Sequence, residues 1–222
     1  MKLLALITAV LLLPQEKNEA EELFKKMEEK IAKARTAQAR VTGELGPTGI
    51  AITATCWLGE GKEARVDLEG RIGGGVLKSN LISDGKKVRL EAPGKDPALF
   101  DAPEHLGRLS RTFLTRNGIM GMFDMAFESK SIRAESAPNT RMTDIASGAR
   151  EKVGDREALE VRYRLGGGKD PDRVSVWIDV ATHLPLKRVV KQGDTNLTVT
   201  YSEFKLNEKI DAAKFELPKE AK

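Results

Sequence analysis

The feature that most constrains the fold of this 222-residue chain is a stretch near its C-terminus, residues 174–204, in which apolar and polar side chains alternate. The apolar positions are Val174, Val176, Ile178, Leu197, Val199 and Tyr201. A period of two is typical of a strand with one apolar face. Pro185 suits the first residue of a further strand, and residues 192–196 have the composition of a turn. The stretch therefore predicts three antiparallel strands in a meander, with one apolar face and one solvated face.

The same alternation recurs in residues 37–92 and 149–165, with no helical pattern inside either region. Asp84-Gly85 is a strong hairpin signal, and residues 59–62 form another turn. The apolar positions that we expect to face the core include Val66, Leu68, Leu81, Leu90 and Val161. Cys56 falls on the same face, so we interpret it as a structural thiol. As the only cysteine it excludes an intrachain disulfide.

Two segments have helical patterns. Residues 19–35 place Leu23, Phe24, Met27, Ile31 and Ala34 on one face, which needs a sheet to pack against. Residues 101–116 predict a helix with Asp101 as N-cap and Pro103 in the first turn, ended by Asn117-Gly118. Residues 131–148 are polar and indicate a loop or an edge strand.

Residues 119–127 hold three of the six methionines and two of the seven phenylalanines. Ile119, Met122, Phe123, Ala126 and Phe127 form one helical stripe, and Met120 and Met125 lie off it. A wide Met-rich surface suits contact with flexible apolar ligands, whereas a plain core helix is the default interpretation. Gly121 within the helix, and apolar groups around most of its circumference, favour the ligand surface.

The N-terminal residues 1–13 have a positive start followed by an apolar run of the length of a secretory signal. The run is short for a membrane span, and no small-x-small cleavage motif follows, so an uncleaved anchor stays open. We expect residues 1–20 to be a signal peptide, residues 21–222 to form a single domain, and the protein to be exported to the periplasm or cell envelope.

Composition and motifs exclude several functions. The net charge is +4, and basic residues are interleaved with acidic ones, which disfavours nucleic-acid binding but permits contact with anionic lipid. Two histidines and one cysteine do not make a usual metal site. Neither a nucleophile elbow nor a phosphate loop is present. We therefore expect no cofactor and no enzymatic activity.

Several segments resemble the LolA-like superfamily, which includes periplasmic carriers of outer-membrane lipoproteins and RseB-type sensors. The segments are residues 177–187, 201–207 and 215–218, together with residues 83–88 and 153–158. The resemblance implies an α+β fold, in which a single curved antiparallel sheet forms an incomplete β-barrel and helices pack on its concave apolar face. No functional residue of the carriers maps onto a specific position here.

Pattern and resemblance together predict a monomeric envelope protein that shelters acyl chains of lipoproteins or lipids in a hydrophobic cavity, with envelope membrane proteins as further candidate partners. The expected lining residues are Phe113, Ile119, Met122, Phe123, Phe127, Val66, Leu68, Leu81, Leu90, Val161, Val176 and Ile178. A sensor or protein-interaction module of the same fold, with the cavity filled by its own helices, is the alternative. An enzyme that uses surface carboxylates ranks last.

Overall fold

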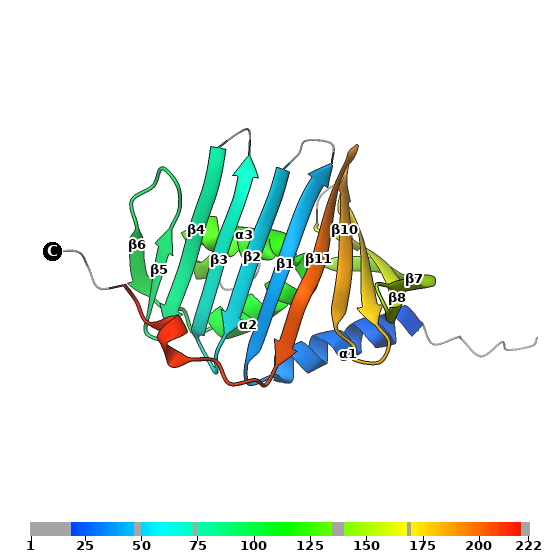
Figure 1. Ribbon diagram of the computed structural model, residues 1–222, viewed down its shortest axis with the longest axis horizontal. Coiled ribbons are helices and arrows are strands. Elements are labelled where there is room, and N and C mark those ends of the chain that lie inside the picture. Colours follow the sequence, from blue (N-terminus) through cyan, green and yellow to red (C-terminus); the bar gives the residue numbers. More distant parts are fainter. Residues whose placement is uncertain (1–18, 47–49, 73–74, 135–139, 168–169, 219–222) are drawn as a thin grey trace, which may run out of the picture.

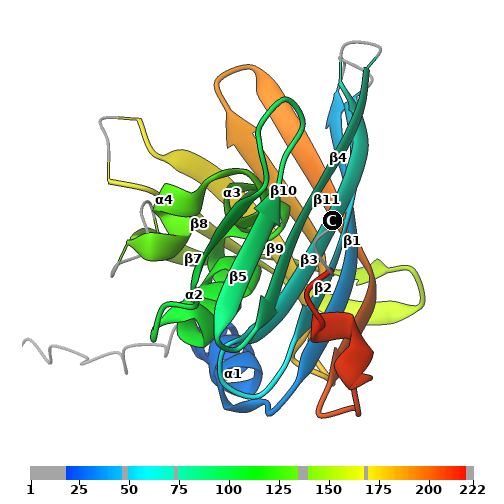
Figure 2. The same cartoon turned by 90° about the vertical axis from the view of Figure 1, so that its left-hand side faces the viewer.

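The computed structural model describes residues 19–46, 50–72, 75–134, 140–167 and 170–218. Within these ranges, eleven strands form one open, curved antiparallel sheet, and the main helices lie on its concave side (Figures 1 and 2). This confirms the predicted fold class. The predicted signal peptide falls almost entirely on residues 1–18, which lie outside the described residues. No helix in the described ranges is long and apolar enough to cross a membrane.

The strands are β1 (Ala37–Gly46), β2 (Ile50–Leu58), β3 (Glu63–Ile72), β4 (Gly75–Asp84), β5 (Lys87–Glu91), β6 (Ala98–Asp101), β7 (Met142–Val153), β8 (Arg156–Leu165), β9 (Asp172–Asp179), β10 (Pro185–Gln192) and β11 (Thr195–Leu206). The helices are α1 (Glu19–Lys33), α2 (Leu106–Thr112), the π-helix η1 (Phe113–Asn117), α3 (Ile119–Phe127), α4 (Ser129–Arg133) and the 3-10 helix η2 (Ala212–Phe215). The predicted meander is confirmed as β9–β11, with Pro185 at the first position of β10.

The sheet consists of two meanders joined at its middle. Its strand order is β6-β5-β4-β3-β2-β1-β11-β10-β9-β8-β7, so every neighbour is sequential except the central pair β1 and β11. That pair aligns Ala37 with Leu206. Helices α2 to α4 connect the two outer strands, β6 and β7, and therefore cross the concave face from one edge to the other (Figure 2).

The core lies between the concave face and the helices. Helix α1 buries Leu23, Phe24, Met27 and Ile31, the apolar stripe expected from the sequence. Phe24 packs edge-on against Tyr163 of β8, with ring centroids 5.3 Å apart. The buried thiol of Cys56 points into the same core, and burial raises its pKa to about 12. A thiol held protonated in this way is structural, as predicted.

The helix predicted to start at Asp101 begins later. Residues 98–101 form β6, where Asp101 pairs with Lys87 of β5 in the sheet and by an ion pair of 2.7 Å. Helix α2 begins at Leu106 with His105 at the N-cap, so the N-cap prediction for Asp101 was wrong. Of the polar segment 131–148, residues 142–148 belong to the edge strand β7, one of the two outcomes expected, whereas residues 131–133 belong to helix α4, which was not expected.

The convex face of the meander is not uniformly solvated, contrary to prediction. Trp177 forms a small second apolar cluster with Ala158 and Leu186, and the ammonium of Lys187 lies 4.5 Å from its ring centroid. Asp179 is also buried on this face. Its carboxylate accepts hydrogen bonds from the backbone N–H groups of the following turn and pairs with Arg156, and these contacts compensate for its loss of solvent.

Candidate functional site

The residues expected to line an acyl-chain cavity lie together on the concave side, but most of them form a packed core. Ten belong to a single cluster in which each is at most 5% exposed: Phe113, Ile119, Met122, Val66, Leu68, Leu81, Leu90, Val161, Val176 and Ile178. Phe123 and Phe127 are half-buried and stack on each other with centroids 4.3 Å apart. The helices thus occupy the volume that an open half-barrel would offer.

Helix α3 is packed against the protein on two sides. Met125, expected off the apolar stripe, is buried, and Met120 is 44% exposed. Gly121 explains the close packing, because a Cβ atom built there would lie 2.6 Å from the Cβ of Phe113 in η1. The helix therefore packs against the sheet on one side and against the preceding helical turn on the other. Its apolar residues are accounted for by these two contacts.

A buried arginine joins the sheet to the helices. Arg188 of β10 is fully buried on the concave face, between Val176 and Val199 in register. Its guanidinium donates to the carbonyls of Thr115 and Arg116 in η1, and the hydroxyl of Tyr163 donates to the Arg116 carbonyl at 3.0 Å. These carbonyls end a helix, where backbone acceptors lack helical partners. Arg188 therefore ties the helical segment to the sheet.

Gly118 lets the chain turn at this point. Its φ is +60°, a conformation that favours glycine, and it follows η1 directly. A Cβ atom there would lie 2.8 Å from the Tyr201 hydroxyl and 3.3 Å from the Nε of Arg188. The turn between η1 and α3 is thus packed directly onto the buried polar group.

One apolar pocket remains at the end of the sheet where β1 ends and β2 begins. It has a volume of about 270 Å³ and extends between α3 and strands from both meanders. Its lining residues are Gly43, Leu45, Ile50, Ile52, Ile119, Met120, Phe123, Asp172, Val190, Thr195 and Leu197. Of the residues singled out in the sequence, it brings together Ile119 and Phe123, along with the exposed Met120.

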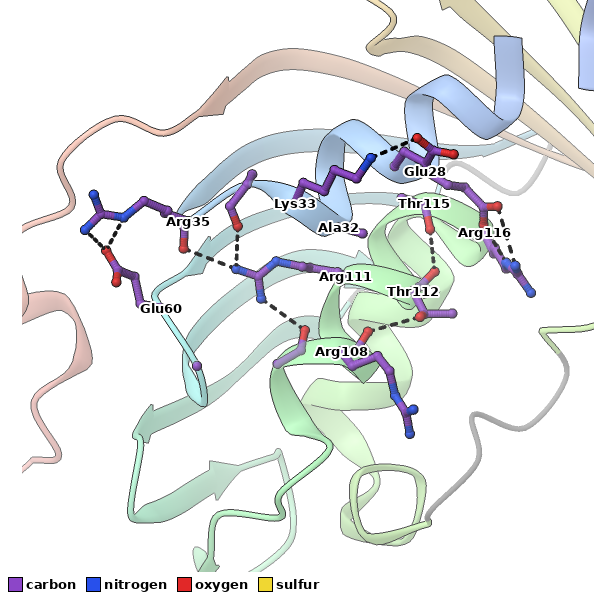
Figure 3. Close-up of a pocket in the computed structure, with 14 residues that line it drawn as sticks. Glu28, Ala32, Lys33, Arg35, Glu60, Arg108, Arg111, Thr112, Thr115 and Arg116 are labelled. Atoms are coloured by element: carbon purple, nitrogen blue, oxygen red, sulfur yellow. Dashed lines mark hydrogen bonds and ion pairs between the residues drawn. The ribbon is translucent and has the colours of Figure 1, made fainter. Parts of the chain in front are cut away.

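A second, polar groove of about 670 Å³ lies between α1, the β2–β3 turn and α2 (Figure 3). Ion pairs join Arg116 to Glu28 at 2.6 Å and Lys33 to Glu29 at 3.0 Å. Arg111 reaches across the groove to backbone carbonyls on the other side. No residue of this groove was predicted as a site residue, since its cations come from two segments far apart in the sequence, residues 33–35 and 108–116.

The sequence matches no protein-family model and no curated protein. Among solved structures, MucB is similar over 91% of this chain and 64% of its own length, with a TM-score of 0.52 and 12% identity. The chain thus spans less than two thirds of MucB. It has a LolA-like fold. LprF from Mycobacterium bovis matches at a TM-score of 0.49 and 11% identity, over 88% of this chain and 96% of LprF. LolA superfamily protein NE2245 from Nitrosomonas europaea matches at 0.35 and 11% identity, over 89% of this chain and 97% of NE2245.

In the described residues, no three His, Cys, Asp or Glu side chains gather as they would around a metal ion. On the helical segment, the carboxyl of Asp124 in α3 has a raised pKa. Burial, together with the negative charge of Glu128 one turn later, raises it to about 6.

Asp124 predicts a pH dependence of stability. The folded protein binds this proton more tightly than the unfolded chain, whose carboxyl titrates near 3.8, so stability rises as the pH falls from above 6 towards 4. Because the carboxyl is partly exposed, we expect Asp124→Asn to stabilise the protein at pH 7.5 by about 1 kcal/mol, well below the full value of the shift. Thermal melts between pH 4 and pH 8 measure this. The gap between the variant and the wild type should close near pH 4, and a gap that does not change with pH would refute the assignment.

Proposed function

We propose that the protein is a non-enzymatic binding protein of the cell envelope that shelters the end of an acyl chain from a lipoprotein or lipid. The observation that carries the proposal is the apolar pocket beside α3, which stays open although the rest of the concave face is filled. The LolA-like fold supports a general binding role, and the experiments below test the ligand.

The size of the pocket sets the affinity and length of the ligand. At about 30 Å³ per water molecule, and a similar volume per methylene, it accommodates about nine methylenes. Each buried methylene contributes about 0.8 kcal/mol, or roughly 7 kcal/mol in total, before the cost of immobilising the chain. Binding should therefore be weak and reversible, as a protein that returns its ligand to a membrane requires.

Chain-length dependence tests this directly. Fatty acids of increasing length compete with a fluorescent fatty acid for the purified protein. The affinity should rise about fourfold per methylene up to about ten carbons and then level off, because further carbons lie outside the pocket. Native mass spectrometry with solvent extraction checks for lipid carried through purification. Failure to bind any chain length, with a clean apo mass, would refute the proposal.

A glycine pair on β1 provides a matched test. Gly43 lines the pocket, where its Cβ would lie 3.0 Å from Ile119, whereas a Cβ at Gly46 would meet nothing within 4 Å. We expect Gly43→Leu to weaken fatty-acid binding at least tenfold by filling the pocket, and Gly46→Leu to leave it unchanged. Equal binding by both variants would exclude this pocket as the site.

The packed core favours a second candidate, a sensor or interaction module of the same fold that binds a protein on its outer surface. Ten of the twelve expected lining residues are core residues, and α3 is clamped on two sides. In that case the affinity for fatty acids does not depend on chain length, and Gly43→Leu changes the stability of the protein but not its fatty-acid binding.

A further inference from the structure

The groove between α1 and α2 has more positive charge than its own side chains neutralise. Its cationic residues are Lys33, Arg35, Arg108, Arg111 and Arg116, and its acidic residues are Glu28, Glu29 and Glu60. Each acid already has a partner, in Arg116, Lys33 and Arg35 respectively. Five cations less three carboxylates leave a charge of +2, carried by Arg108 and Arg111, which have no carboxylate partner in the described part of the chain.

Arg111 and Arg116 are both half-buried, but Arg116 pairs with Glu28 whereas Arg111 has no carboxylate partner among the described residues. Its guanidinium donates to the carbonyls of Ala34 at 3.1 Å, Arg35 at 3.2 Å and Gly59 at 3.1 Å, and its Nε has no partner within the described residues. Burial lowers its pKa, yet a guanidinium stays charged at any physiological pH. Neutral carbonyls satisfy its hydrogen bonds without cancelling its charge, so the groove keeps an attractive field for anions.

The arrangement of the cations indicates what kind of anion fits. In Figure 3, Arg35 with Glu60 and Arg116 with Glu28 lie at opposite ends of the groove, Arg111 lies between them, and the side chain of Arg108 is drawn without a partner. A single phosphate would meet only part of such a line. A flat membrane surface would reach the exposed Arg108 but not the half-buried Arg111.

We propose that this groove binds an acidic segment of a protein partner, with carboxylates of the segment against Arg108 and Arg111. The chain's own Glu28, Glu29 and Glu60 already make contacts of this kind with the neighbouring cations. At about 670 Å³ the groove is large enough for several side chains. This site lies apart from the apolar pocket, since the two share no lining residue, and does not depend on acyl-chain binding.

The test uses fluorescence anisotropy of the purified protein with a labelled Glu- and Ser-containing peptide, and the same peptide with Gln for Glu as reference. The acidic peptide should bind, weaken as salt is added, and weaken about five- to tenfold on Arg108→Glu. The control is Arg71→Glu, an exposed arginine on β3 with the same change in net charge. It should lower the affinity by less than twofold. Arg108→Gln should give an intermediate loss, and circular dichroism checks the fold of each variant.

Three results would overturn the proposal. Equal binding of the Glu and Gln peptides means that carboxylates are not recognised, and equal loss in Arg108→Glu and Arg71→Glu means that only net charge matters. Displacement of the peptide by inorganic phosphate at a similar concentration means a single-anion site. In a parallel arm, binding to phosphatidylglycerol vesicles that depends on Arg108, without binding of the peptide, assigns the surface to a membrane instead.

Discussion

Replacing Arg188 with alanine is expected to destabilise the protein by about 3–5 kcal/mol, because it removes two hydrogen bonds from a charged group and a large buried side chain. The substitution removes the Arg188 donors to the Thr115 and Arg116 carbonyls, of which the Arg116 carbonyl keeps the Tyr163 hydroxyl, and leaves a cavity beside Tyr163. Buried acceptors without partners cost about 1–3 kcal/mol each. Urea unfolding followed by circular dichroism measures the loss.

Two further variants separate the contributions at Arg188. Arg188→Met restores most of the volume but no donor, so it should recover only part of the loss. Arg173→Ala removes an exposed arginine from the adjacent strand β9 and should change stability by less than about 0.5 kcal/mol. If Arg188→Met were as stable as the wild type, the hydrogen bonds to η1 would contribute nothing net, and the role assigned to Arg188 would be wrong.

Helix α3 offers the second large effect, a contrast between two methionines two residues apart. Met122 is 1% exposed in the core, and Met120 is 44% exposed at the apolar pocket. We expect Met122→Ala to cost about 2–5 kcal/mol, as truncation of a core side chain does. Met120→Ala should cost less than about 0.5 kcal/mol.

The two methionines also distinguish a filled core from an open cavity. If the concave face held lipid in the native protein, Met122 would contact a ligand, and extraction of that ligand would abolish most of the difference between the two variants. Urea unfolding before and after solvent extraction makes the comparison. A difference that survives extraction shows that Met122 packs against the protein itself.

Strand alternation allowed most of the sheet to be predicted, because a period of two depends on local sequence and on the presence of a core. The convex cluster at Trp177 escaped prediction for a related reason. A register shift between Pro185 and Lys187 interrupts the alternation, so Leu186 packs beside Trp177 while Lys187 lies over the same ring. Such an irregularity is decided by pairing with β9 and not by the order of residues along β10.

The strand β6 and the start of α2 could not be separated in the sequence. Residues 98–101 are too few to display a period, and Asp101 followed by Pro103 has the composition of a helix start. The residue pairs instead with Lys87, a contact across 14 positions that exists only once β5 is in place. The contact with β5 thus overrode the local preference for a helix start.

For the candidate site, the sequence predicted the residues that face the concave side but not how much space they leave. Whether apolar side chains line a cavity or fill it depends on how closely α3 approaches the sheet, and Gly121 sets that approach against Phe113. The sequence does carry a signal for Arg188, because this residue shares a strand face with Val190 and is a charge in phase with apolar residues. The polar groove had none, because Lys33, Glu60 and Arg108 are brought together only by the fold.

The central pairing of β1 with β11 has a consequence for how the chain folds after synthesis. Each meander consists of neighbours in sequence and can form early, but the seam between them joins positions as far apart as Ala37 and Leu206. Closing so long a loop is slow, and until it closes each half exposes an unpaired strand edge and half of an apolar face. Strand β1 cannot complete its pairing until β11 has been synthesised, so a newly made chain is vulnerable to aggregation until its C-terminal residues are available.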